Sequence, residues 1–142
     1  MSATSIELKA PAKLNLFLHV VGRRTDGMHL LESVFALIDL CDDIVLELDP
    51  SGKISRTGDV IGDMDKDLCV RAARRLQQIS GTTIGCRIHV TKRIPAGAGM
   101  GGGSSDCAST LMGLNKLWGL NWPQEKLMSI GESLGADVPF FL

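Results

Sequence analysis

The alternation of apolar and polar positions predicts β-strands in the first third of the chain. Between residues 6 and 21 apolar side chains recur at every second position, with Lys13 and Asn15 on polar positions between them. A period of two is typical of a strand that buries one face. Two further extended segments are predicted after a polar break at 22–27: residues 30–37 and residues 42–48, which end at the turn sequence Pro50-Ser-Gly52.

Helical periodicity dominates the rest of the chain. A helix ended by Gly81 is predicted over 67–79, with an apolar stripe made of Leu68, Ala72, Leu76 and Ile79. A strand over 86–94 precedes a second helix over 104–118, with a stripe made of Cys107, Leu111, Leu114 and Trp118. A third helix is predicted over 124–134, where Gly135 ends it.

Composition describes an ordinary globular chain. The sequence has 142 residues, of which 44% are hydrophobic and 22% charged, and the mean hydropathy is +0.15. A chain of this size buries roughly two thirds of its unfolded surface as one domain. These values exclude a disordered, collagen-like or coiled-coil protein.

Charge and cysteine usage exclude several kinds of partner. Lys and Arg number 15 against 16 Asp and Glu, so no broad electrostatic field favours nucleic acid or a membrane as a partner. The cysteines lack zinc-ligand spacing and are expected to be reduced and mostly buried: Cys41, Cys69, Cys86 and Cys107. The sequence shows no leader segment and no run of about 18 apolar residues, so the chain is expected to be cytoplasmic.

Glycine is concentrated in one loop between the predicted strand 86–94 and the predicted second helix. Backbone N–H groups and the positive end of the helix dipole converge in such a loop, which favours a bound phosphate. Glycine also lets the backbone approach phosphoryl oxygens closely. The expected phosphate-binding residues are Pro95, Ala96, Gly97, Ala98, Gly99, Met100, Gly101, Gly102, Gly103, Ser104 and Ser105. The two serines are expected to cap the helix or to donate hydroxyl hydrogen bonds.

Three familiar glycine loops do not fit this segment. The helix after the loop is followed by another helix rather than by a strand ending in an acidic residue, which argues against a dinucleotide fold. Gly103-Ser104 stands where a P-loop requires Lys followed by Ser or Thr. The Val-Ala-Ile-Lys, His-Arg-Asp and Asp-Phe-Gly segments of protein kinases are absent from the sequence. The loop therefore belongs to another class of phosphate site.

The charged candidates are ambiguous when each is taken alone. Lys13 and Asn15 share the polar face of a strand, where most side chains are simply solvated. Asp137 precedes Val138-Pro and is expected to cap a final helix. The aspartates between Asp59 and Asp67 lack the Gly and Glu that a calcium loop requires, so the segment is interpreted as a solvated loop.

Three segments together resemble the GHMP kinases. They are Pro11-Ala-Lys-Leu-Asn-Leu with Arg24-Thr-Asp-Gly-Met-His29, the glycine loop 95–105, and Gly135-Ala-Asp-Val-Pro-Phe-Phe. They occur in the order of the family and span nearly the whole chain. The resemblance implies an α+β domain of the ribosomal protein S5 domain 2-like type over residues 1–142. It also implies an enzyme that transfers the γ-phosphoryl group of ATP to a hydroxyl group of a small cytidyl substrate.

The resemblance also implies roles for individual residues. Asp137 is expected to accept the proton of the substrate hydroxyl group, and Lys13 to orient Asp137 and offset the charge on the phosphoryl group. Asn15 is expected to line the acceptor site with Asp137, while His29 and the backbone around Met28 recognise the cytosine. The glycine loop holds the phosphates of ATP. Mg²⁺ is expected to accompany ATP, with no metal ligand assigned in the chain.

Several positions depart from the pattern of the family. Met28 stands where Tyr usually precedes the His, and Asp67 where Asn commonly precedes the Leu that contacts adenine. Gly102 stands where other branches have a magnesium-binding Ser. Family members continue past the Asp-Val-Pro segment into a C-terminal domain, which is expected as a partner from the same gene product. The 142 residues alone are expected to be inactive or poorly soluble.

Three alternatives stay open at this point. A related kinase acting on homoserine, mevalonate or a sugar would share Lys13 and the loop but would not need Asp26-Gly-Met-His29. The same type of fold serves RNA-binding domains, against which the near-zero net charge argues. A nucleotide-binding fragment without catalysis is the third alternative.

Overall fold

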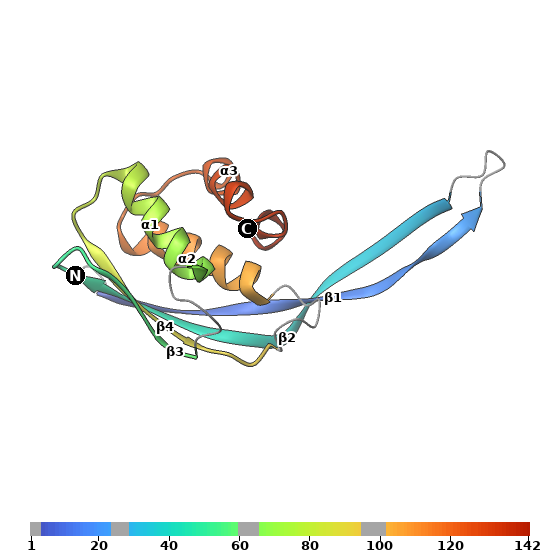
Figure 1. Ribbon diagram of the computed structural model, residues 1–142, viewed down its shortest axis with the longest axis horizontal. Coiled ribbons are helices and arrows are strands. Elements are labelled where there is room, and N and C mark those ends of the chain that lie inside the picture. The colour runs from blue at the N-terminus through green and yellow to red at the C-terminus, as the bar shows by residue number, and fades with distance from the viewer. Residues whose placement is uncertain (1–3, 24–28, 60–65, 95–101) are drawn as a thin grey trace.

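The computed structural model describes residues 4–23, 29–59, 66–94 and 102–142. Within 13–39 it describes the backbone only. Its elements are β1 (Ser5–Arg23), β2 (His29–Asp49), β3 (Ile54–Gly58), α1 (Leu68–Ser80), β4 (Gly85–Thr91), α2 (Gly102–Leu117), α3 (Gln124–Leu134) and the 3₁₀ helix η2 (Val138–Phe141). The strands form one sheet in the order β1-β2-β4-β3, antiparallel except for the β3–β4 pair. The helices lie on one face of this sheet, and β1 and β2 continue beyond it as a two-stranded ribbon (Figure 1). The α+β class is confirmed.

Alternation along the strands determines which face the helices cover. In β4 the side chains of Cys86, Ile88 and Val90 are buried, while those of Arg87 and His89 between them are exposed. The buried positions of neighbouring strands join them in the core, which α1 and α2 close from above. One face of the sheet is therefore apolar and the other polar, as the period of two predicts.

Helix α2 is the centre of the molecule. Every residue from Ser105 to Leu111 is buried, because the helix packs on β1 and β2 and is flanked by α1, α3 and η2. Gly113 allows this close approach to the sheet. A Cβ atom at Gly113 would lie 2.5 Å from Leu46 Cδ1 and 2.7 Å from Leu8 Cδ1.

Most of the predicted elements are present, with shifted ends. The segments 30–37 and 42–48 are parts of the single strand β2, and the short edge strand β3 was not predicted, because Ile54 is its only large apolar residue. Ile79 is 44% exposed instead of buried. The packed face of α1 is centred on Cys69, Ala72, Ala73 and Leu76, which leaves Ile79 near the edge of that face.

The interpretation of 59–67 as a solvated loop is wrong at Asp67, whereas Asp59 is exposed as expected and residues 60–65 lie outside the described part of the chain. Asp67 is the N-cap of α1 and accepts hydrogen bonds from the N–H groups of Cys69 (2.8 Å) and Val70 (3.2 Å). Its other oxygen lies 3.3 Å from Nε of the buried Arg56. Asp59 accepts a hydrogen bond from the N–H of Lys92 at 2.9 Å.

The cysteines behave as expected. None of the four forms a disulfide, and Cys69, Cys86 and Cys107 are buried. Burial raises the pKa of the Cys86 and Cys107 thiols to about 12, so they remain protonated and unreactive.

Among the helices in the described ranges, none combines the length and the apolarity that a bilayer crossing needs.

Candidate functional site

The two ends of the glycine loop lie in contact with each other. Residues 95–101 of the predicted phosphate site are outside the described part of the chain, but Ile94 before them and Gly102 after them are within it. A Cβ atom at Gly102 would lie 3.0 Å from Ile94 Cγ2 and 3.3 Å from Lys92 Nζ. A side chain at this position would therefore pack tightly against the preceding segment.

The serines of the loop lie within the first turns of α2 rather than before it. The helix begins at Gly102, so the expectation that Ser104 or Ser105 caps it is wrong. Ser104 is half-buried and Ser105 is fully buried. In the described part of the chain the Ser105 hydroxyl has no hydrogen-bond partner.

Three charged side chains meet between the sheet and the first turns of α2. Lys92 Nζ lies 2.7 Å from Asp42 Oδ2 and 2.8 Å from Asp106 Oδ2. Asp42 Oδ1 also accepts hydrogen bonds from the backbone N–H groups of Arg93 (2.6 Å) and Ile94 (2.9 Å). Asp42 is fully buried, Asp106 is 4% exposed, and the Lys92 side chain is 15% exposed. We call these three residues the charged cluster.

Burial and mutual contact shift the pKa values within the charged cluster. Burial raises the pKa of Asp106 to about 7, and the adjacent Asp42 adds to this, while Lys92 opposes it. Burial would also raise the pKa of Asp42, but hydrogen bonds to that carboxyl group outweigh burial and hold its pKa below the usual value. The pKa of Lys92 is raised, because its two carboxylate partners outweigh the effect of burial.

Sequence analysis missed the charged cluster, although a signal for it was present. Lys92 continues the alternation of the buried positions Cys86, Ile88 and Val90 in β4. Asp42 likewise precedes the buried Ile44 by two positions. Two charged residues in phase with apolar ones on adjoining strands indicate a buried ion pair.

Asp137 occupies the position predicted for it but forms no side-chain cap. It immediately precedes η2, where it is exposed and its carboxylate makes no capping hydrogen bond to the helix. The predicted final helix is a short 3₁₀ turn that packs against α2. The N-terminal end of α2 and the η2 turn lie at the same end of the helical layer, above the place where the β1–β2 ribbon leaves the sheet (Figure 1).

The remaining predicted residues lie on the β1–β2 ribbon. In its register Lys13 is paired with Leu37 and Asn15 with Phe35, whereas His29 is paired with Arg23 at the far end. The ten steps along the strand from Lys13 to Arg23 extend roughly 33 Å at about 3.3 Å per residue. His29 is therefore not adjacent to Lys13 in this chain. Met28 and the side chains of Lys13, Asn15 and His29 lie outside what the structure describes.

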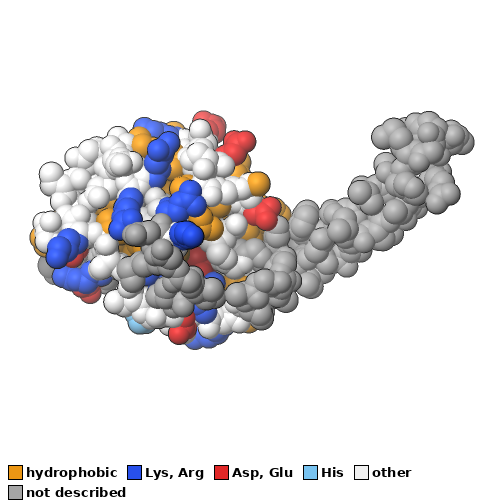
Figure 2. All heavy atoms as spheres, in the orientation of Figure 1, with side chains coloured by type: hydrophobic (Ala, Val, Ile, Leu, Met, Phe, Trp, Pro, Cys, Tyr) orange, Lys and Arg blue, Asp and Glu red, His pale blue; other side chains and the backbone are white. Residues whose placement is uncertain are grey.

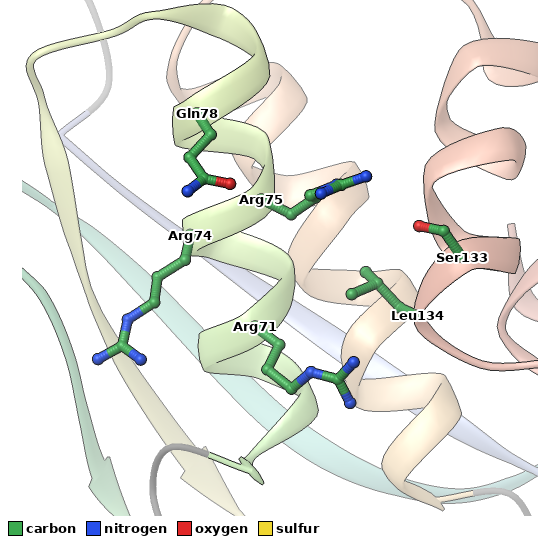
Figure 3. Close-up of a pocket in the computed structure, with 6 residues that line it drawn as sticks. All are labelled: Arg71, Arg74, Arg75, Gln78, Ser133 and Leu134. Carbon is green, nitrogen blue, oxygen red and sulfur yellow. The ribbon is translucent and has the colours of Figure 1, made fainter.

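Basic side chains gather over α1 (Figure 2). A pocket of about 290 Å³ lies between this helix and the end of α3, lined by Arg71, Arg74, Arg75, Gln78, Ser133 and Leu134. Arg71 and Arg75 point toward α3 and Arg74 points the other way (Figure 3). The carbonyl end of α3 carries partial negative charge, so these two guanidinium groups complement it.

Magnesium has no ready-made protein cage in the described part of the chain. No group of three or more His, Cys, Asp or Glu side chains there is arranged to hold a metal ion. Mg²⁺ in phosphoryl-transfer sites commonly uses substrate phosphates and water for most of its ligands.

Comparison with known proteins gives consistent matches. The family described as "GHMP kinases N terminal domain" matches residues 67–142, more than half of the chain. Two curated relatives bear the name 4-diphosphocytidyl-2-C-methyl-D-erythritol kinase. The protein from Paracidovorax citrulli is 60% identical over 96% of this chain and 48% of its own length. The protein from Ralstonia pickettii is 56% identical over 100% of this chain and 50% of its own length.

Solved structures agree on the fold. A crystal structure of 4-(cytidine 5'-diphospho)-2C-methyl-D-erythritol kinase matches with a TM-score of 0.72 and 42% identity, over 96% of this chain and 48% of that one. The homoserine kinase of Cytophaga hutchinsonii matches with a TM-score of 0.69 at 20% identity, over 94% of this chain and 42% of that one. The chain thus spans about half the length of the curated relatives it matches.

Proposed function

This chain belongs to the GHMP kinase family, and from that membership we propose that it is the ATP-binding N-terminal part of a 4-diphosphocytidyl-2-C-methyl-D-erythritol kinase. The enzyme transfers the γ-phosphoryl group of ATP to the 2-hydroxyl group of its substrate, in the non-mevalonate route to isoprenoids. Its products are ADP and the 2-phosphate. It acts in the cytoplasm, in keeping with cysteines that form no disulfide.

The observation that carries this proposal is the similarity over nearly the whole chain to relatives of that name, at 60% and 56% identity. The homoserine kinase, at 20% identity, supports the fold alone. The identities of 60% and 56% to relatives of that name favour the cytidyl substrate over homoserine, mevalonate or a sugar. The net charge of −1 gives no support to a role that consists of RNA binding alone.

The geometry supports a phosphate site at the loop. The N-terminal end of α2 presents backbone N–H groups and the positive end of its dipole at Gly102. In our proposal residues 95–105 bind the phosphates of ATP, and Mg²⁺ enters with the nucleotide. Oriented N–H groups, one lysine and the metal offset the phosphate charge, so a protein with a net charge of −1 needs no basic surface.

The reacting groups come from the two ends of the chain. We propose that Asp137 accepts the hydroxyl proton. Lys13 orients Asp137 and the transferring phosphoryl group. Asn15 lines the acceptor site, and His29 with the backbone of Met28 binds the cytosine. The relatives are about twice as long as this chain. In our proposal the additional half is a C-terminal domain of the same gene product, which completes the site.

The test is ADP release from ATP and Mg²⁺ by the complete gene product. We expect release to require the cytidyl-methylerythritol substrate and cytidine diphosphate to inhibit it. Release with homoserine, mevalonate or a sugar in place of that substrate would overturn the proposal.

Asp137→Asn tests the assignment of the base. We expect kcat to fall about 10²- to 10³-fold while ATP affinity is retained, because the amide cannot accept the proton. Glu125→Gln, an exposed carboxylate in the first turn of α3, is the matched control and should leave kcat unchanged. A kcat within twofold of the parent for Asp137→Asn would remove Asp137 from the mechanism.

A further inference from the structure

The segments on either side of the glycine loop are joined by buried charges. We propose that Asp42, Lys92 and Asp106 form a clamp that holds the two segments flanking the phosphate-binding loop, 92–94 and 102–106, in place for ATP, and that Asp106 takes up a proton when the nucleotide binds. The three are positioning residues, which act through the loop and not by touching the substrate. The inference rests on the proposed function, since the ligand of the loop is taken to be ATP.

The contacts of the clamp run from the sheet to the helix. Asp42, on β2, receives the N–H groups of Arg93 and Ile94 at 2.6 and 2.9 Å and so fixes the backbone just before the loop. Lys92 Nζ donates to Asp42 Oδ2 on one side and to Asp106 Oδ2 on the other, at 2.7 and 2.8 Å. Asp106 belongs to α2, just after the loop. One series of contacts therefore ties both ends of the loop to the sheet.

This arrangement has a direct use for a phosphate site. Glycine-rich segments lose more conformational entropy on ordering than any other, which weakens the binding of any ligand that must order them. Fixing both ends reduces the number of loop shapes before ATP arrives. The contact between Gly102 and Ile94 shows that the ends are held close together. Loss of the clamp should therefore weaken ATP binding more than binding of the acceptor substrate.

The surroundings of Asp106 make its protonation sensitive to a nearby anion. Asp42 from β2, Lys92 from the segment after β4, and Cys69 from α1 face it, with Cys107 beside it on α2. Asp106 Oδ1 is buried and has no hydrogen-bond partner among the described residues. A buried carboxylate with a bare oxygen is unstable relative to its neutral form. The pKa of about 7 agrees with this environment.

ATP brings further negative charge to the same helix end. Asp106 lies four residues after Gly102, or about 6 Å along the helix axis. The polyphosphate at the N-terminal end of α2 should favour neutral Asp106, so that binding takes up a proton. By linkage, ATP affinity should then fall as pH rises through 7.

The experiment uses the complete gene product and two variants of the clamp. The double variant Lys92→Met with Asp106→Asn breaks the connection across the loop and removes one charge of each sign, so that Asp42 keeps only its two backbone donors. Asp106→Asn alone keeps an oxygen for Lys92 but cannot titrate. Arg87→Met, which breaks an exposed ion pair with Glu47 on the outer face of β4, is the matched control. Thermal melting checks that each variant folds, and Lys92→Arg, which keeps the charge, should behave like the parent.

Two measurements are made on each protein. Hydrogen exchange over 92–106 reports the clamp without any nucleotide, and we expect exchange in this segment to be about tenfold faster in the double variant only. Calorimetry of ATP binding in two buffers of different ionisation enthalpy reports affinity and proton uptake. We expect the double variant to lose about tenfold in ATP affinity, and Asp106→Asn to lose proton uptake and the decline of affinity above pH 7.

The outcomes separate the clamp from the proposed function. Unchanged exchange over 92–106 in the double variant overturns the clamp, and so does ATP affinity within twofold of the parent. Equal proton uptake by the parent and Asp106→Asn overturns the protonation of Asp106. A parent enzyme that releases no ADP in the presence of the cytidyl substrate contradicts the proposed function instead, and the exchange measurement still decides the clamp.

Discussion

At the scale of single residues, buried charge is the most informative feature of the molecule. Asp42 and Asp106 are almost completely buried, and both depend on Lys92. Removing one partner from a buried pair costs about 3–5 kcal/mol, because the other charge is left without compensation. The residues that carry this liability lie directly beside Ile94 and on α2, the described segments that flank the glycine loop.

The high pKa of Asp106 predicts how stability changes with pH. Its folded-state pKa of about 7 lies above the unfolded value of 3.8, so above pH 4 the unfolded state ionises first. This group's contribution to stability is present below pH 4, falls as pH rises toward 7, and is constant above 7. Melting temperatures of the parent and Asp106→Asn should therefore differ in a pH-dependent way between pH 5 and 7 only. A difference that is constant from pH 5 to 8 would show that Asp106 titrates normally.

Asp67 illustrates a substitution that the structure explains. It stands where the family commonly has Asn, and both residues are good N-caps. The carboxylate adds an ion pair with the buried Arg56, which also donates to the carbonyl oxygens of Thr57 and Asp59. Asp67 therefore links α1 to the end of β3 as well as capping the helix.

At the scale of elements, the distance between α2 and the sheet is set by Gly113. Glycine within a helix costs about 1 kcal/mol relative to alanine, so its presence in the most buried helix needs a packing reason. The side chains of Leu46 and Leu8 occupy the space where its Cβ atom would lie. Helix propensity and packing thus act in opposite directions at this position, and packing prevails.

Gly113→Ala should therefore destabilise the protein by about 1–3 kcal/mol, because the added methyl group overpacks the core. Gly103→Ala is the matched comparison, since the nearest atom to its Cβ position is Leu68 Cδ1 at 3.7 Å and alanine fits there. Chemical denaturation of both variants measures the effect. If the Gly113→Ala variant is as stable as the Gly103→Ala variant, α2 can move away from the sheet without cost.

At the scale of the whole molecule, the helices cover one face of the sheet and the β1–β2 ribbon projects from it (Figure 1). The curated relatives are about twice as long, and the reacting residues that we assign lie on the ribbon and beside η2. Phosphoryl-transfer sites need closure to exclude water and to hold both substrates. In our proposal the second half of the gene product supplies that closure.

A comparison of the 142-residue chain with the complete gene product tests this organisation. We expect the complete product to release ADP in the presence of the cytidyl substrate, and the 142 residues alone to show less than about one per cent of that rate, since a misplaced or open site costs 10²-fold or more. Comparable turnover by the two would show that the second half is dispensable for the chemistry.

The sequence by itself determined most of the elements and the place of the glycine loop. Apolar periodicity depends on local backbone geometry, so it located α1, α3 and most of the sheet, and glycine spacing located the loop between β4 and α2. The family resemblance supplied the roles of Lys13 and Asp137, which no spacing along the chain could have indicated.

Only the tertiary structure decided which distant residues meet. Asp42 and Lys92 are fifty residues apart in sequence, and they are joined because β2 and β4 pair and place both side chains under α2. Arg56 and Asp67 depend in the same way on the packing of α1 beside β3. Burial and electrostatic partnership are properties of the assembled core, which no local pattern contains.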